Sequence, residues 1–280
     1  MKKIVLCADD FSLNEYISLG IIDLIKHKRL SAVSCLVNSS NWTSHAGWLI
    51  PFVNHIDIGL HFNLTEGKSI SSHTYWHQGT FPPLKKLLID GYLRRIPRDA
   101  VHHELQAQID TFRHMMKRDP DFIDGHQHIH QFPLVRDILL KVYEENFADK
   151  HPYIRVSTNS LLKAAQSPIA RGKNCVIFMT GGYKLRKLLN KRNISYNKSF
   201  YGAYNFSIQK NYKKYFSYFL SQIDEGGIIM CHPAKAKFYD QQDPIAEARI
   251  EEYTFLKSAD FHTLCEIFKI NLVRFHTINK

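Results

Sequence analysis

The chain has 280 residues, of which 44% are hydrophobic and 22% are charged, as in ordinary globular proteins. This composition excludes a disordered chain, a collagen and a coiled coil. The 37 Lys and Arg residues outnumber the 26 Asp and Glu residues, and the resulting net charge of +11 would suit an anionic partner. Because the basic residues are scattered along the chain, they do not favour nucleic acid as that partner.

Strand and helix patterns alternate along the sequence. Short apolar runs rich in β-branched residues predict strands at residues 4–8, 31–37, 55–64, 122–128, 153–156, 176–179, 227–231 and within 261–275. Apolar residues at helical spacing predict helices after a capping box formed by Ser12 and Glu15, at 84–89, at 99–117, from Pro133, from Tyr183, near 210–224, at 244–257 and within 261–275. Residues 66–98 contain many Gly and Pro residues and are expected to form a long excursion.

Strands that alternate with helices predict an α/β fold with a parallel sheet covered by helices. About seven βα units favour a single distorted, TIM-barrel-like (βα) barrel, and no glycine-rich nucleotide motif follows the first strand. No linker or repeat interrupts the pattern, so residues 1–280 are expected to form one domain. No apolar run is long enough to span a membrane, and two carboxylates stop the N-terminal run, which favours a cytoplasmic protein.

Ionisable residues follow several of the predicted strands, where parallel α/β folds place their active sites. Asp9 and Asp10 follow the first strand, and in extended chain their side chains would point to opposite sides, one to a metal and one to a substrate. His61 lies in the third strand, and His232 ends the strand at 227–231. Either histidine taken alone is compatible with a buried core residue.

The densest histidine cluster lies at the end of the predicted strand 122–128. Alternate residues of a strand share one face, so the pattern predicts that His126, His128 and His130 point to the same side. Three histidines on one face have little structural purpose without a metal ion or hydrogen-bond partners. The cluster therefore favours metal binding or acid–base chemistry.

Taken together, one aspartate and two histidines from three strand ends would bind a divalent cation and leave positions open for water. Such a cation polarises a carbonyl group and acidifies bound water. A second carboxylate would then act as general base, and a further histidine as general acid. The combination predicts metal-assisted hydrolysis of an amide or ester.

The sequence resembles the YdjC-like carbohydrate deacetylases, which include the chito-oligosaccharide deacetylases, from residue 1 to about residue 260. The resemblance is carried by four motifs in the same order: Ala8-Asp9-Asp10-Phe11, residues 59–67, residues 124–133 and Met230-Cys231-His232-Pro233. It implies a metal-dependent N-deacetylase of an acetylated amino sugar on a distorted barrel. Because relatives tend to dimerise, it also implies a homodimer.

The resemblance further implies roles for individual residues. The implied site consists of Asp10, His61 and His126 as ligands of one divalent ion, Asp9 as base, His232 as the acid that protonates the leaving amine, and Arg155 and His128 as substrate contacts. Magnesium is the ion assigned in the family, whereas this ligand set suits zinc chemically.

Two positions depart from the family pattern, because Ser12 and Ala234 stand where relatives usually have glycine. Serine lacks the freedom of glycine to adopt a positive φ, so the loop under the metal is expected to differ slightly. The basic, aromatic stretch 183–215 does not align, and the net charge would suit a charged or lipid-linked acetylated sugar.

Two other classes of protein remain as alternatives. One is a metal-dependent hydrolase of the amidohydrolase or phosphoesterase kind. Such enzymes usually carry His-x-His at the first strand, where this chain has two aspartates. The other is a non-enzymatic basic protein that binds an anionic glycan or nucleic acid, which predicts salt-sensitive binding without turnover.

Overall fold

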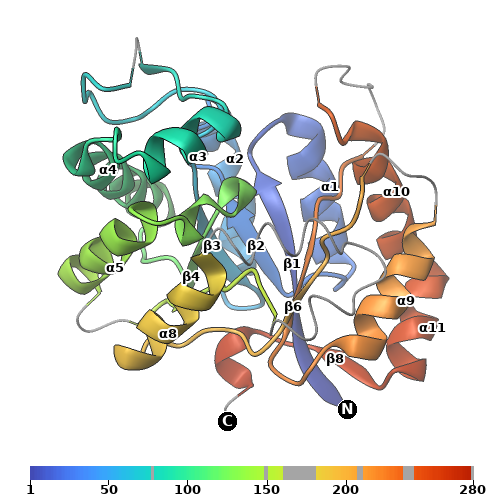
Figure 1. Cartoon of the computed structure of the whole chain (residues 1–280). Helices are drawn as coiled ribbons and strands as arrows, with labels where there is room; N and C mark the ends of the chain where they lie inside the picture. Colours follow the sequence, from blue (N-terminus) through green and yellow to red (C-terminus); the bar gives the residue numbers. More distant parts are fainter. Residues whose placement is uncertain (77–78, 148–150, 160–180, 207–210, 236–242, 279–280) are drawn as a thin grey trace.

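The computed structural model describes residues 1–76, 79–147, 151–159, 181–206, 211–235 and 243–278. Its centre is a parallel sheet in the order β5-β4-β3-β2-β1-β7-β6, and β8 pairs with the start of β1 (Figure 1). The strands are β1 Lys2–Phe11, β2 Ala32–Cys35, β3 Asp57–Phe62, β4 Phe122–Gly125, β5 Tyr153–Ile154, β6 Phe200–Tyr201, β7 Ile228–Cys231 and β8 Ile270–Leu272. The fold is the predicted distorted barrel.

Side-chain amides close the sheet between its two edges, β5 and β6. The Asn159 side chain accepts a hydrogen bond from the Phe200 backbone N–H at 2.7 Å and donates to the Phe200 carbonyl at 2.6 Å. The buried Asn197 side chain makes the same reciprocal pair with the backbone of Val156, at 2.7 and 2.9 Å. Because an amide side chain offers the same donor and acceptor as a peptide group, both residues replace missing ladder pairs.

Helices surround the sheet (Figure 1), with α4 and α5 on one flank and α1, α9, α10 and α11 on the other. The α-helices are α1 Glu15–Lys26, α2 Trp42–His45, α3 Leu84–Tyr92, α4 Arg98–Met116, α5 Val135–Asn146, α8 Tyr183–Lys191, α9 Tyr212–Gln222, α10 Ala246–Lys257 and α11 Ala259–Ile267. The short 3-10 helices are η1 Ala46–Phe52, η3 His126–Gln131 and η5 Phe275–Thr277. No helix in the described part of the chain is long and apolar enough to span a membrane.

The strands are buried on both faces, which divides the core into two layers. Ile4, Leu6 and Ala8 of β1 pack against the helices, whereas Val5 and Cys7 belong to a smaller cluster inside the barrel. Aromatic rings fill that interior, including the stacked rings of Phe122 and Tyr153. Gly59 of β3 leaves room for them, because a Cβ atom there would lie 2.4 Å from the Phe122 ring.

The N-terminal cap of α1 differs from the prediction. Asn14 caps the helix, because its Oδ1 accepts the Ile17 N–H at 2.9 Å. Ser12 lies two residues earlier, where its hydroxyl donates to the Leu36 carbonyl at 2.6 Å. Ser12 adopts a φ of 73° although it is not glycine, so serine does take up a positive φ in this loop. Its N–H, which donates to the Ser18 hydroxyl, helps to hold it there.

The predicted strand 122–128 ends at Gly125, and the chain continues as the 3-10 helix η3. Gln127 and His128 have φ values of 52° and 60°, so strand alternation does not apply to them. The prediction that His126, His128 and His130 share one face is therefore wrong. The chain turns back so tightly that a Cβ atom on Gly125 would lie 2.9 Å from the His130 ring.

Most other predicted elements are confirmed with shifted ends. They are the strands at 4–8, 31–37, 55–64, 153–156 and 227–231, the helices at 84–89, 99–117, 210–224 and 244–257, and the final helix and strand. The predicted strand 176–179 lies outside the described residues. The sequence did not predict β6, α2 or η1, and α5 begins at Val135, two residues after Pro133.

Candidate metal and substrate site

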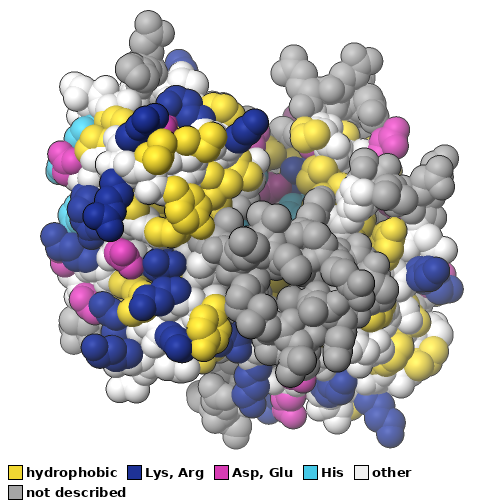
Figure 2. Space-filling view, in the orientation of Figure 1, with side chains coloured by type: hydrophobic (Ala, Val, Ile, Leu, Met, Phe, Trp, Pro, Cys, Tyr) yellow, Lys and Arg dark blue, Asp and Glu magenta, His cyan; other side chains and the backbone are white. Residues whose placement is uncertain are grey.

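A cavity of about 490 Å³ opens at the carboxyl ends of β1, β3, β4 and β7. Figure 2 shows a recess on this face, with acidic and histidine side chains visible in its depth. Six of the predicted site residues line the cavity: Asp9, Asp10, His61, His126, His128 and His232. The topology brings them together because parallel strands place their carboxyl ends at one edge of the sheet.

A β-bulge at the end of β1 places both aspartates on the cavity wall. The pairing of β1 with β2 shifts register between Ala8 and Phe11, and Asp10 has a φ of 66°. In a regular strand, Asp10 would point away from Asp9, toward the helices. The bulge turns Asp10 back into the cavity, as bulges near active sites commonly do.

Asp10, His61 and His126 form a buried cluster that could hold a metal ion, with ligand atoms all within 4.8 Å of one another. Asp10 Oδ1 lies 3.4 Å from His61 Nε2 and 3.0 Å from His126 Nδ1. One carboxylate oxygen and two imidazole nitrogens therefore face a common point. This donor set suits a divalent cation such as zinc.

The outward nitrogen of each histidine contacts a further carboxylate. His61 Nδ1 lies 2.6 Å from Asp124 Oδ1, and His126 Nε2 lies 2.9 Å from Glu66 Oε2. Such carboxylates fix the tautomer and orientation of metal-binding histidines, because the nitrogen that bears the proton is then turned away from the metal. The residues present therefore fit a divalent metal ion.

Asp9 is held by Arg155 rather than by the histidines. The Arg155 guanidinium donates to both oxygens of Asp9, at 2.6 and 2.8 Å, and lies 2.9 Å from Asp124 Oδ2. Burial by itself raises the pKa of Asp9, but the Arg155 charge, the nearby His61 and the Arg155 hydrogen bonds together outweigh burial and hold that pKa well below its usual range. Cys7, Asp9 and Asp124 also lie close enough to hold a metal, but the guanidinium contacts all three and fills that space.

Arg249 of α10 contacts Asp10 from the other side. Its Nη2 donates to Asp10 Oδ2 at 2.8 Å, and its Nε donates to Asp243 at 2.6 Å. Burial opposes ionisation of Asp10, but Arg249 and then His126 outweigh it, so the pKa of Asp10 lies well below its usual range. Oδ2 is thereby paired with an arginine, and Oδ1 is the oxygen that faces the histidines.

His232 lies across the cavity from the histidine pair, with Nε2 4.0 Å from Asp9 Oδ2. Its ring meets Phe206 edge-on at 5.3 Å, and its backbone N–H donates to the buried Glu252 at 2.5 Å. Burial lowers the pKa of His232 to about 4 despite the nearby Asp10 and Asp9 carboxylates, so the ring is neutral at pH 7. Burial also raises the pKa of Glu252 to about 7.

The remaining predicted residues occupy different positions. His128 lines the cavity, and its ring packs edge-on against Phe200 at 5.7 Å. His130 is fully buried and bonds to the Arg155 carbonyl at 2.8 Å, away from the cavity. Arg155 has no exposed surface and is not among the lining residues, so it lies behind Asp9 rather than on the wall.

Sequence reasoning missed four residues of this site: Glu66, Asp124, Arg249 and Glu252. Glu66 and Asp124 belong to the motifs that carry the family resemblance, but no pattern indicated their contacts. Arg249 and Glu252 lie three residues apart on the buried face of α10. Charged residues within the buried stripe of a helix were the available signal, since such charges are rarely buried unless paired.

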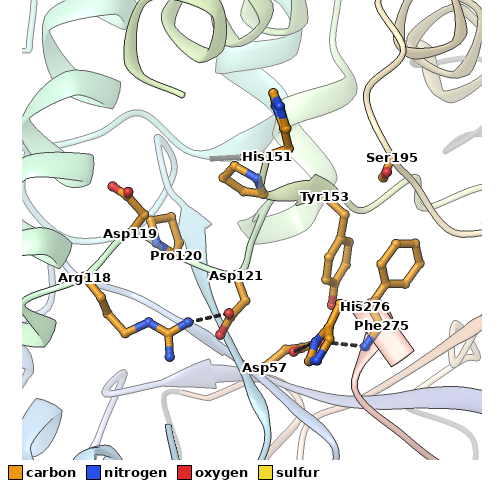
Figure 3. A pocket seen from close by; sticks show the side chains of 11 residues that line it. Asp57, Arg118, Asp119, Pro120, Asp121, His151, Tyr153, Ser195, Phe275 and His276 are labelled. Carbon is orange, nitrogen blue, oxygen red and sulfur yellow. Dashed lines mark hydrogen bonds and ion pairs between the residues drawn. The ribbon is translucent and has the colours of Figure 1, made fainter. Parts of the chain in front are cut away.

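A second cavity, of about 510 Å³, lies at the opposite end of the sheet (Figure 3). Its carboxylates are already paired. Asp57 accepts bonds from Arg274 and the Phe275 N–H, and Asp121 accepts bonds from Arg118, Arg274 and the Ile58 N–H. These contacts tie the C-terminal segment to the amino ends of β3 and β4. In barrels, residues at this end typically contribute to stability rather than to catalysis.

The fold and the site define a (βα)-barrel protein with a carboxylate–histidine cluster, a candidate cation site, at the carboxyl edge of its sheet. The model of the YdjC-like protein family matches residues 3–266, so the chain belongs to the YdjC-like family. The matched curated relatives include the chitooligosaccharide deacetylase of Citrobacter koseri, 27% identical over 179 residues that cover 60% of this chain and 65% of the relative. The carbohydrate deacetylase of Xenopus laevis is 32% identical over 153 residues, covering 51% and 48%. The alignments thus span about half to two thirds of these relatives.

Solved structures support the fold. A crystal structure from Enterococcus faecalis, of a protein provisionally assigned to cellobiose-phosphate cleavage, superposes with a TM-score of 0.75 at 20% identity. The superposition covers 99% of this chain and 98% of that chain. The Bc1960 peptidoglycan N-acetylglucosamine deacetylase superposes with a TM-score of 0.50 at 11% identity, over 99% and 87% of the two chains. At these identities the likeness concerns the fold alone.

Proposed function

We propose that this protein hydrolyses the N-acetyl group of an acetylated amino sugar, of chito-oligosaccharide type, with one divalent ion held by Asp10, His61 and His126. The observation that carries the proposal is that the two adjacent aspartates contact different partners. Asp10 faces two histidines, whereas Asp9 is held by Arg155 and faces His232. The names of the matched relatives, chitooligosaccharide and carbohydrate deacetylases, supply the substrate class.

A bound divalent ion, zinc or magnesium, would polarise the acetamide carbonyl and acidify the attacking water. The chain's own residues would then handle the protons. Asp9 is ionised, and Arg155 fixes both of its oxygens, so its carboxylate can accept a proton from water in one defined orientation.

His232 would protonate the departing amine. Because this ring is neutral at pH 7, it must first receive the proton that it donates. Asp9 Oδ2 lies 4.0 Å from His232 Nε2, so the two side chains would have to approach by about 1 Å before the proton taken from water can pass to His232 and from there to the nitrogen as the C–N bond breaks. The proton balance closes without an external acid, and the products are acetate and a free amine.

The other predicted contacts are proposed as follows. His128 lines the cavity and would contact the sugar. Phe206 lines the same cavity beside His232 and offers an apolar surface to a sugar ring. We propose Arg155 as a positioning residue of Asp9, in place of the substrate contact expected from the resemblance, because it is buried behind that carboxylate.

The test is acetate release from diacetylchitobiose by chelator-stripped protein, with zinc, with magnesium and without added metal. We expect release only when a divalent metal is present. A His126→Ala variant, which lacks one proposed ligand, should lose both metal binding and turnover. Metal-independent release would contradict the proposed role of the ion, and hydrolysis of a phosphoester without acetate release would contradict the substrate class.

A further inference from the structure

Among the described residues, Glu66 is a carboxylate near His61 and His126 to which neither the motif pattern nor the proposed chemistry assigns a role. It follows β3 by four residues and lines the cavity. Its Oε2 lies 2.9 Å from His126 Nε2, and its side chain keeps 47% of its surface exposed. Because solvent competes for so exposed a carboxylate, its contact with the buried His126 adds little to the stability of the fold by itself.

The contact repeats the arrangement at His61. His61 directs Nε2 toward Asp10 and Nδ1 toward Asp124, and His126 directs Nδ1 toward Asp10 and Nε2 toward Glu66. An ionised carboxylate can only accept, so each histidine donates its outer N–H to its own carboxylate, and the inner nitrogen, which faces Asp10, is the one that would give up its proton to bind a cation. The tautomer with only the outer N–H is the one in which both rings can bind a cation.

The polypeptide around Glu66 is held in place by a network of amide side chains. Asn63 Oδ1 accepts from the N–H groups of Thr65 and Glu66, and its Nδ2 donates to the Glu66 carbonyl at 2.7 Å. Asn38 Nδ2 also donates to that carbonyl, at 3.1 Å, and Gln108 binds the backbone of Asn63 at both its N–H and its carbonyl. The backbone of Glu66 is therefore fixed from several sides although its side chain faces the cavity.

We infer that Glu66 is a positioning residue that fixes His126 for the metal ion. Its counterpart Asp124 is fully buried and also pairs with Ser34 and Arg155, so it supports the barrel as well as His61. Glu66 has no such structural contacts through its side chain in the described part of the chain. Removing it should therefore weaken metal binding without weakening the fold. The inference rests on the metal site of the proposed function, but its test requires no turnover.

The experiment is a calorimetric titration of chelator-stripped protein with zinc for the wild type, Glu66→Leu, Glu66→Ala and Glu66→Gln. We expect Leu and Ala to weaken zinc binding by about 10- to 100-fold, the usual effect of losing such a partner. Glutamine should retain affinity within a few-fold, because its amide oxygen accepts the same N–H. Thermal unfolding of the metal-free variants should match that of the wild type.

The matched control is Glu145→Leu. Glu145 contacts His102 Nε2 at 2.8 Å with a similar side-chain exposure of 42%, but on the outer surface of α4 and α5. This variant should bind zinc like the wild type. Wild-type affinity in both Glu66→Leu and Glu66→Ala would overturn the inference, as would equal weakening by Glu145→Leu. Since the titration needs no substrate, an inactive wild type would refute the proposed function and leave this result standing.

Discussion

The two adjacent aspartates are the residues on which the proposed chemistry depends most. They share one cavity because the bulge and the positive φ of Asp10 reverse strand alternation at that point. A different arginine pairs with each of the neighbouring carboxylates, Arg155 with Asp9 and Arg249 with Asp10, so both can be ionised at once. Without these cations, two buried carboxylates side by side would be expected to share a proton.

These different partners predict different outcomes for two single substitutions. Asp9→Asn should lower kcat for acetate release by about 100-fold or more, the range for loss of a general base, while zinc affinity stays within a few-fold. Asp10→Asn should weaken zinc binding itself. Parallel kinetics and calorimetry on both variants would test this. Unchanged kcat in Asp9→Asn would remove Asp9 from the proposed mechanism.

Glu252 provides a pH test at the same scale. Its pKa is raised to about 7 by burial, from an ordinary value near 4.5. The folded state then holds this proton more tightly than the unfolded state, so its contribution to stability is full below about pH 4.5 and is lost as pH rises toward 7. Glu252→Gln should therefore gain stability relative to the wild type on going from pH 5 to pH 8, by about 3 kcal/mol at most.

Urea unfolding of both proteins at the two pH values gives this difference directly, because the other titrating groups cancel. Glu251→Gln is the control, since Glu251 neighbours Glu252 on α10 but bonds to the backbone of Tyr212 instead. A pH-independent difference between Glu252→Gln and the wild type would show that Glu252 ionises normally.

Two parts of the fold position the site without supplying a proposed ligand. One is α10, and the other is the β5–β6 seam, the place where Asn159 and Asn197 join the two edges of the sheet. One turn of α10 carries both Arg249, which contacts Asp10, and Glu252, which contacts the backbone of His232. The helix thus sets the proposed proton donor and one proposed metal ligand relative to each other. The seam positions Arg155, because Arg155 directly precedes Val156, whose backbone N–H donates to Asn197.

The seam yields a stability prediction. Asn197→Ala removes both hydrogen bonds to the buried backbone of Val156, and each unsatisfied buried group costs about 1–3 kcal/mol. We expect a loss of about 2–4 kcal/mol in the free energy of unfolding. Urea denaturation would measure it, with the exposed Asn190→Ala in α8 as control. A loss no larger than that of Asn190→Ala would mean that the barrel does not depend on this amide pair.

For the whole molecule, the two ends of the barrel have separate tasks. The carboxyl edge of the sheet holds the candidate site, and the amino edge holds the paired carboxylates around Asp57 (Figure 3). Arg274 links the C-terminal segment to Asp57 and Asp121 at this amino edge. Stability and activity should therefore respond separately to substitutions at the two ends.

Arg274→Ala tests that separation. It leaves the buried Asp57 without its cation, and breaking one side of such a pair typically costs about 3 kcal/mol or more, reduced here because Arg274 is partly exposed. The melting temperature should fall while kcat and zinc affinity remain those of the wild type. Lys213→Ala, which breaks an exposed pair with Asp260, should change stability by less than about 1 kcal/mol. Loss of zinc affinity in Arg274→Ala would contradict the separation.

The sequence by itself determined the class of fold, because alternating apolar runs and helical stripes are local patterns. The helix predicted at 99–117 forms as α4, and its apolar stripe from Val101 to Met116 is buried. The sequence also identified the strand ends that meet in the cavity, since parallel strands must place their carboxyl ends together. Asp9, Asp10, His61, His126, His128 and His232 could be named for that reason.

Only the tertiary structure decided how these residues are oriented and what supports them. Backbone turns with positive φ at Asp10, Gln127 and His128 override the strand alternation on which the sequence prediction relied. The partners Glu66, Asp124, Arg249 and Glu252 come from segments far apart in sequence, and no spacing rule connects them to the residues that they hold. Periodicity is a property of neighbours along the chain, whereas the contacts that set charge and orientation arise only when distant segments pack together.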